Sequence, residues 1–210
     1  MKKPSSMWFL YLFAFLAQPG CGRVPTRQDI EMELLAPRLA SEQPEVVFSA
    51  LGELVDLCET PLGAKKMIDW LKSRCYDDQG KRVGRVAISW VPPSMLQYYW
   101  EDLYELIESC DDDQYKVLIE ISLARGGDKG AIDLIIQSME RVDDHSLLMN
   151  IDSHLERLGL GSSLFYMMGH WYEVDQGHTE DEVVKWYWRE RWKRVRNIVA
   201  YDQRTGRWQE

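Results

Sequence analysis

The chain carries four histidines and a run of three aspartates, the residue types that most often hold a metal ion. His145, His154, His170 and His178 have none of the short spacings with which two imidazoles share one face of a helix. The run at 111–113 lacks the glycine and the terminal glutamate of an EF-hand calcium loop. We therefore predict that the histidines are polar loop residues and that the aspartates cap a helix. No metal and no cofactor is expected.

Motifs for covalent or phosphate chemistry do not occur either. The sequence has no G-x-S-x-G, G-x-x-x-x-G-K-[ST] or G-x-G-x-x-G segment, and no evident pairing of a cysteine nucleophile with a histidine base. We therefore predict no catalytic residue and no enzymatic activity. The alternative is a small-molecule-binding protein or an enzyme with a cleft between residues 76–93 and 160–178. The residues of these segments that could contact a ligand are Arg82, Arg85, Trp90, Tyr166, His170, Trp171 and His178.

Residues 1–21 have the three-part pattern of an export signal. Lysines at positions 2 and 3 precede 11 uncharged, mostly apolar residues, 7–17. A helix that spans a bilayer needs about 20 apolar residues, so this stretch fits the centre of a cleaved signal better than a membrane anchor. The sequence therefore predicts a signal peptide and a location outside the cytoplasm.

The end of this signal resembles the signals of bacterial lipoproteins, in which cleavage precedes a cysteine that carries lipid on its sulfur. Gly20 and Cys21 match the last two positions of that motif, whereas Gln18 and Pro19 replace its usual leucine and small residue. The resemblance implies lipidation of Cys21 and a membrane-anchored protein of the periplasm or outer membrane of a bacterium. The alternative is simple cleavage after Gly20 or Gly22, which leaves Cys21 an incidental thiol.

The net charge limits the classes of possible partner, and the number and spacing of the cysteines limit the possible disulfides. The formal net charge is −9, which argues against nucleic-acid binding because that activity needs a basic surface. Beyond Cys21 the chain has Cys58, Cys75 and Cys110 and no C-x-x-C motif. In an oxidising compartment these fit either one disulfide with a free thiol or three buried thiols. Cys75–Cys110 is the disulfide to test first, because Cys58 and Cys75 fall near opposite ends of an expected helical hairpin.

Apolar spacing and turn signals divide the rest of the chain. Residues 22–43 are polar with two prolines, and we predict a tether that contains a short helix. From residue 44 apolar residues recur at spacings of three and four, as in amphipathic helices, so 44–178 is predicted to be an all-α domain. The turn residues and prolines of 76–93 predict a long loop inserted into it. Residues 179–210 are predicted to be a capping helix with a tail.

Two acidic pairs indicate a helical repeat. Asp112-Asp113 and Asp143-Asp144 lie 31 residues apart, and each pair is expected to begin a helix. Segment 127–135, a Gly-Asp turn that leads into paired aliphatic residues, resembles HEAT-like repeat proteins of the phycobilisome-lyase type. The resemblance implies a short α-solenoid of helical hairpins with a binding or scaffold role. The alternative is an irregular helical bundle.

The Trp-rich C-terminal region resembles the end of exported bacterial HEAT-like proteins. Its tail shares with them the segment Tyr201-Asp202 followed by Thr205-Gly206-Arg207-Trp208. Before this tail, apolar residues recur along one helical face and predict a cap over the open end of a solenoid. The residues of this face are Val184, Trp188, Trp192, Val195 and Val199.

A second face of the same helix is basic. It is expected to contact an acidic partner, anionic lipid or the acidic segment of the chain itself. The residues of this face are Lys185, Arg189, Lys193 and Arg196. Trp90 is either an exposed contact residue or folded back onto the helices. Together these five residues form the predicted surface for another protein of the cell envelope.

Overall fold

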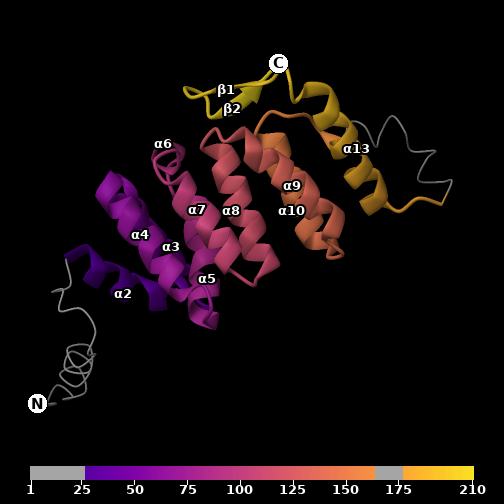
Figure 1. The fold of residues 1–210 in the computed structure, drawn as a ribbon. Coiled ribbons are helices and arrows are strands. Elements are labelled where there is room, and N and C mark those ends of the chain that lie inside the picture. The colour runs from indigo at the N-terminus through magenta and orange to yellow at the C-terminus, as the bar shows by residue number, and fades with distance from the viewer. Residues whose placement is uncertain (1–26, 164–176) are drawn as a thin grey trace, which may run out of the picture.

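The computed structural model describes residues 27–163 and 177–210 (Figure 1). Most of these residues are helical, which confirms the all-α prediction. The first helices are α2 (Arg27–Leu39), α3 (Pro44–Cys58), α4 (Pro61–Arg74), α5 (Asp78–Ala87) and the 3-10 helix η1 (Ile88–Trp90). They are followed by α6 (Pro93–Leu96), α7 (Trp100–Ser109), α8 (Asp113–Arg125), α9 (Lys129–Arg141), α10 (His145–Arg157) and α13 (Glu180–Val195). Strands β1 (Ala200–Asp202) and β2 (Arg207–Gln209) form an antiparallel hairpin after α13.

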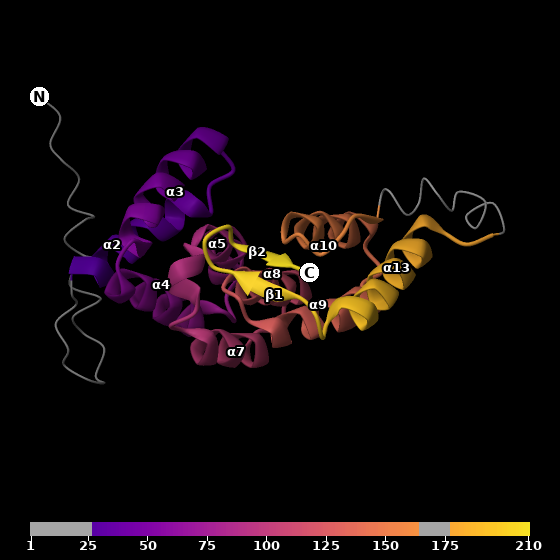
Figure 2. The ribbon, with the colours of Figure 1, turned by 90° about the horizontal axis from the view of Figure 1, so that it is seen from above.

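The helices follow one another along the long axis of the molecule, in the order of the chain (Figure 1). Contacts reflect this order: α5 packs against α2, α4 and α8, α8 against α7, α9 and α10, and α13 against α9 and α10. Seen from above, α3 and α10 lie on one side of the row and α7 and α9 on the other (Figure 2). One hydrophobic core runs through the row, from Met32 in α2 to Trp208 in β2.

Side-chain caps fix where most of the longer helices begin. Asp112, Asp128 and Asp144 accept hydrogen bonds from backbone N–H groups at the starts of α8, α9 and α10, each of which has 13 residues. Thr179 does the same for α13, where Glu182 completes a capping box. A cap of this kind stabilises a helix by about 1 kcal/mol. The capping role predicted for the aspartate run is therefore confirmed.

The short helix predicted within 22–43 is present as α2, but the polar tether predicted around it is wrong from Arg27 onward, because α2 joins the packed domain. The helix buries four side chains at spacings of three and four against α3, α4 and α5. These side chains are Met32, Leu35, Ala36 and Leu39. Charged residues between them, and Pro37 inside the last turn, hide this stripe in the sequence.

The predicted loop insertion at 76–93 is also wrong, because α5 and η1 occupy it. Asp77, whose surroundings look like a turn, accepts a hydrogen bond from the backbone N of Gly80 at 2.6 Å and caps α5. The buried face of α5 includes Gly80 and Gly84, and glycine gives neither helix propensity nor an apolar signal. A Cβ at position 84 would lie 2.1 Å from Cζ of Tyr115 in α8, so the glycine permits the close approach of the two helices.

The hairpin after α13 was not predicted, and it returns to the middle of the row. Trp208 is buried there. Its indole Nε1 donates a hydrogen bond to the carbonyl oxygen of Ala124 at 3.2 Å, and its backbone N donates one to the carbonyl oxygen of Leu158 at 2.8 Å. The hydroxyl of Tyr201 donates to the carbonyl oxygen of Arg125. The last carbonyls of a helix have no partner within the helix. The tail therefore pairs carbonyls at the ends of both α8 and α10.

Candidate functional site

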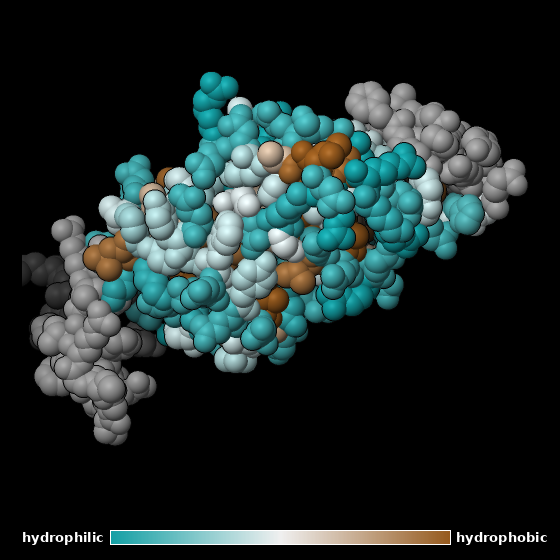
Figure 3. Space-filling view, turned by 45° about the horizontal axis from the view of Figure 1, so that its top comes forward, coloured by the Kyte–Doolittle hydropathy of each residue, from teal (hydrophilic) through white to brown (hydrophobic). Residues whose placement is uncertain are grey.

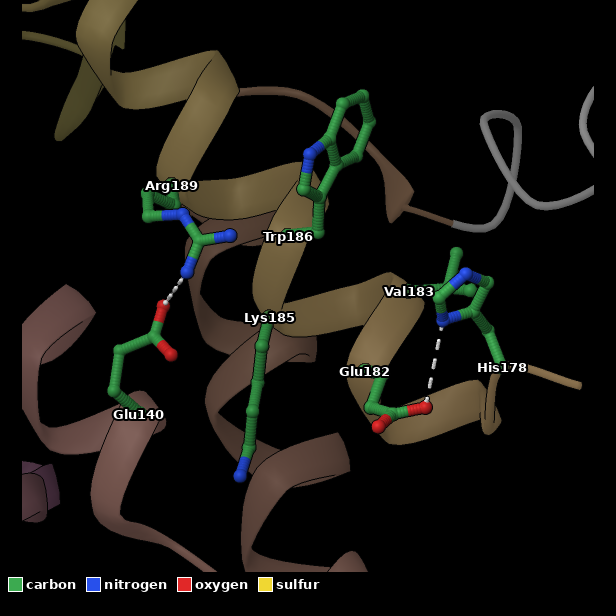
Figure 4. A pocket seen from close by; sticks show the side chains of 7 residues that line it. All are labelled: Glu140, His178, Glu182, Val183, Lys185, Trp186 and Arg189. Atoms are coloured by element: carbon green, nitrogen blue, oxygen red, sulfur yellow. Dashed lines mark hydrogen bonds and ion pairs between the residues drawn. The ribbon is translucent and has the colours of Figure 1, made fainter. Parts of the chain in front are cut away.

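A hollow with a volume of about 620 Å³ lies along the N-terminal half of α13 and reaches α9 (Figure 4). Charged side chains of both signs surround it, together with the indole of Trp186, which is 39% exposed. The described residues that line the hollow are Glu140, His178, Glu182, Val183, Lys185, Trp186 and Arg189. Its volume falls within the range of small-molecule pockets, about 300–1,000 Å³, but its lining is more charged than is typical of them.

The opposite face of α13 fixes which side chains reach this hollow. Trp188 and Trp192 are buried, and their indole N–H groups donate to Asp152 of α10 at 2.6 Å and to Asp133 of α9 at 2.7 Å. Each tryptophan thus combines apolar burial with a directional hydrogen bond. With this face held against α9 and α10, Trp186 points outward (Figure 4).

Both basic residues of the hollow have partners within the chain. Nζ of Lys185 donates to the carbonyl oxygen of Val142 at 2.7 Å, at the C-terminal end of α9, where a cation is favourable. Nη1 of Arg189 lies 2.9 Å from Oε1 of Glu140 (Figure 4). These contacts fit the possibility that the basic face pairs with acidic groups of the chain itself.

His178 and Glu182 are the residues of the hollow that could act as an acid and a base. Nδ1 of His178 lies 3.7 Å from Oε2 of Glu182. That oxygen also accepts a hydrogen bond from the backbone N of Thr179 at 2.8 Å, and this bond lowers the pKa of Glu182. The carboxylate is thus engaged in helix capping, and the described lining includes no hydroxyl or thiol nucleophile.

The other predicted contact residues lie outside the hollow. Lys193 pairs with Glu190 on its own helix at 2.7 Å, and Arg196 lies 3.8 Å from Asp133. Trp90 belongs to η1 and is 47% exposed. The structure therefore brings together only two of the five predicted residues, Lys185 and Arg189.

The alternative cleft between 76–93 and 160–178 is not tested, because residues 164–176 lie outside the described part of the chain. None of the residues that line the hollow comes from 76–93, where Arg85 pairs with Asp112. Other predicted residues lie outside the described part of the chain. These are Cys21, Tyr166, His170 and Trp171.

Trp186 and its acidic neighbours were missed as site residues. A signal for them was present, because Trp186 lies four residues after Glu182 and three before Arg189, and such spacings share one helical face. The buried stripe of Trp188 and Trp192 is the stronger signal in this helix, because it continues along the helix through Val195. Glu140 comes from a different helix, so sequence spacing could not associate it with α13.

Surface apolar side chains occur at scattered positions. On the face drawn in Figure 3, hydrophobic surface appears as separate patches within mostly hydrophilic surroundings. The large apolar or aromatic side chains that are exposed among the described residues are Leu34, Phe48, Leu62, Tyr76, Trp90, Tyr98, Trp186 and Ile198. Of these, only Trp186 lines the hollow.

A buried carboxyl group lies away from the hollow, between α8 and α9. Glu120 is 3% exposed, and its Oε1 accepts a hydrogen bond from the hydroxyl of Ser138 at 3.1 Å. Its Oε2 has no hydrogen-bond partner among the described residues. Burial raises the pKa of Glu120 to about 7, although Ser138 and Arg141 oppose the shift. This group makes the stability of the fold sensitive to pH.

Comparisons of this chain with protein-family models, with curated proteins and with solved structures find no match. Within residues 27–163 and 177–210, no helix has the length and apolar character needed to span a membrane. The same residues contain no group of three or more acidic, histidine or cysteine side chains arranged to hold a metal ion.

Proposed function

We propose that this chain is an exported, lipid-anchored module of the bacterial cell envelope that binds another envelope protein. Its helices form a short α-solenoid of HEAT-like hairpins, and α13 closes the C-terminal end. The partner contacts the hollow around Trp186. The proposal assigns no catalytic step to the chain.

The observation that carries this proposal is the exposed indole of Trp186 on an otherwise well-anchored helix. The inner face of α13 is held by two buried tryptophans, so the outer indole is presented on a rigid support. Tryptophan and arginine are enriched among the residues that contribute most of the binding energy at contacts between proteins. The flanking pair of Arg189 and Glu140 is suited to the polar rim of such a contact.

The solenoid part of the proposal is supported by neighbour-to-neighbour packing. Helices α8, α9 and α10 have equal lengths and begin with an aspartate cap, and each longer helix contacts mainly its neighbours along the row. Solenoids need a different terminal unit to shield the last repeat from water. The tryptophan face of α13 meets that need.

The start of α2 sets the distance between the module and its anchor. Only residues 22–26 separate Cys21 from Arg27. A chain spans at most about 3.3–3.6 Å per residue, so the six steps from Cys21 to Arg27 reach roughly 20 Å. A lipid on Cys21 therefore holds the α2 end of the row near the membrane. The hollow lies at the opposite end, where α13 is located (Figure 1).

The anchor is tested by replacing Cys21 with serine in the natural host. We expect the parent protein to incorporate a labelled fatty acid and to sediment with membranes, and Cys21→Ser to lose both properties. Equal labelling and sedimentation of the two proteins would refute lipidation.

The binding site is tested by co-purification from detergent-solubilised envelopes. We expect Trp186→Ala to lose at least 90% of an envelope protein that the parent retains. Phe48→Ala is the matched control, because Phe48 is 69% exposed on α3, at the other end of the row. Equal recovery with both variants would contradict the assignment of the site to α13.

A further inference from the structure

Two of the three described cysteines occupy equivalent places in neighbouring helices. Cys75 directly follows α4 and Cys110 directly follows α7, and each is the C-cap residue of its helix. Both side chains are buried, and both are free thiols in the structure. Helices α4 and α7 pack against each other.

Ion pairs between α4 and α7 set the register that brings these two positions side by side. Nζ of Lys65 lies 2.8 Å from Oδ1 of Asp102, near the start of α7. One turn before the end of α4, Lys72 contacts the same carboxylate at 3.1 Å and also pairs with Glu105. The two helices therefore run in the same direction, and their C-terminal ends lie next to each other.

A buried tyrosine provides a second indication that the two sulfurs are close. The ring of Tyr115 packs against Gly84, and burial raises the pKa of its hydroxyl. The next contributions to this rise come from the charges of Cys110 and Cys75, so both thiols lie near the same hydroxyl. The charge of Cys110 likewise raises the pKa of Cys75, after the larger effect of burial.

Cys58 differs from this pair and provides an internal control. It is the last residue of α3 and is also buried. Burial alone raises the pKa of Cys58 to about 12, with no contribution from another cysteine. Nothing in the described residues places a second thiol beside it.

We propose that Cys75 and Cys110 form a disulfide that joins the end of α4 to the end of α7. The oxidant is an external disulfide, either a small-molecule disulfide such as oxidised glutathione or the disulfide of an oxidoreductase. The thiolate of one cysteine attacks a sulfur of that disulfide and expels one thiolate. The second cysteine thiolate then attacks the resulting mixed disulfide and expels the other. Two protons leave the cysteines, and two electrons reduce the external disulfide to two thiols.

Burial determines when this reaction takes place. Only the thiolate is nucleophilic, and thiols that are buried and have raised pKa values react slowly. The link therefore forms while the chain folds, before the two sulfurs are buried. Its presence in cells rests on the proposed export to an oxidising compartment, whereas its chemistry can be tested on the purified protein without any export.

The test uses the full mature chain with Cys21→Ser, refolded from urea in a glutathione redox buffer. The refolded protein is quenched with acid and then alkylated in urea, so that free thiols buried in the folded state also react. Mass spectrometry of the non-reduced digest is expected to show a Cys75–Cys110 linked peptide and an alkylated Cys58. The melting temperature of the oxidised protein is expected to exceed that of the reduced protein by about 5–10 °C. Cys75→Ser and Cys110→Ser should abolish both effects, while Cys58→Ser should keep them.

The proposal is overturned if Cys75 and Cys110 are both recovered as free thiols, and therefore alkylated, after refolding in excess oxidised glutathione. It is also overturned if links that include Cys58 form in equal yield, or if oxidation lowers the melting temperature. Because the reduced and oxidised forms of one protein are compared, a serine variant that fails to fold does not affect this conclusion. Absence of the disulfide would not bear on the binding site at Trp186, and absence of partner binding at Trp186 would not bear on the disulfide.

Discussion

The two ends of the helix row are closed by different kinds of contact. At the N-terminal end α2 covers α3, α4 and α5 mainly through apolar side chains. Its polar contacts join side chains to one another: Arg38 pairs with Glu53 at 2.7 Å, and the indole N–H of Trp70 donates to Glu33 at 3.0 Å. At the C-terminal end, side chains of α13 donate hydrogen bonds to backbone carbonyl groups at the end of α9 and just beyond α10. These donors are Lys185 and Arg191.

This difference indicates where the stability of the fold depends on the geometry of hydrogen bonds as well as on the burial of apolar surface. Apolar contacts depend mostly on the area removed from water, so they tolerate small shifts. Hydrogen bonds to buried helix ends require a fixed geometry, and the loss of a donor leaves a buried carbonyl unpaired. The C-terminal end is therefore expected to be the more sensitive of the two to single substitutions.

The largest effect is expected for Trp188→Ala. The change removes a fully buried ring and leaves Asp152 without its 2.6 Å hydrogen bond, so the free energy of unfolding should fall by about 3–5 kcal/mol. Urea-induced unfolding followed by far-ultraviolet circular dichroism measures this loss. Trp186→Ala is the matched control on the outer face of the same helix, with an expected change of about 0.5 kcal/mol. Equal losses would show that α13 is not held by its inner face.

The next effect concerns the buried carboxyl group of Glu120. Its pKa is about 7 in the folded protein against a usual 4.5, so between these pH values the folded state binds more protons than the unfolded state. Stability therefore falls as the pH rises from 4.5 to 7. Glu120→Gln should raise the free energy of unfolding by roughly 3 kcal/mol at pH 8 and have little effect at pH 4.

The measurement for Glu120 is a pair of urea titrations at these two pH values. The same substitution at the exposed Glu42 is the control and should leave the pH dependence unchanged. An equal effect of Glu120→Gln at both pH values would mean that the carboxyl group is ionised to the same extent in the folded and unfolded states.

A smaller effect is expected where α5 meets α8, between the two ends. Gly84→Ala would place a methyl group 2.1 Å from Tyr115, and such overpacking should destabilise the protein by about 1–3 kcal/mol. Gly52→Ala in α3 is the matched control, because a Cβ there has no neighbour within 4 Å. That change should stabilise the protein by about 0.5–1 kcal/mol. Thermal unfolding of the two variants should therefore shift in opposite directions.

The smallest effect is expected for Arg38→Ala at the N-terminal end. Its ion pair with Glu53 is bidentate, but both side chains are exposed to solvent, which screens the charges and leaves the pair a small net effect on stability. The midpoint of urea unfolding should stay within experimental error in high salt and in low salt. A clear loss would show that the α2 end also depends on a directional contact, which would remove the contrast between the ends.

The sequence predicted the helices whose signals are local. The helix starts predicted at Asp112-Asp113 and Asp143-Asp144 are confirmed, because a cap depends only on its own residue and the next turn. The buried stripe of Trp188 and Trp192 was likewise readable from its spacing.

The features that the sequence did not predict have one physical cause in common. Each depends on contacts between residues that are far apart in the sequence. The lack of a side chain at Gly84 in α5 matters only because Tyr115 of α8 lies directly beside it. The packing of α2 into the domain could not be predicted from its sequence. Its apolar stripe is narrow, and the side chains that it contacts belong to α3, α4 and α5. The hollow joins Glu140 to α13 across 49 residues of chain, a pairing that no local pattern reveals.

The most direct test of the proposed function is photo-crosslinking in intact cells, with a photoreactive amino acid at position 186 and, separately, at position 48. The account predicts one discrete adduct with an envelope protein at position 186, formed by the lipid-anchored protein and absent at position 48. Absence of an adduct at 186, or the same adduct at both positions, would contradict a partner-binding site on α13.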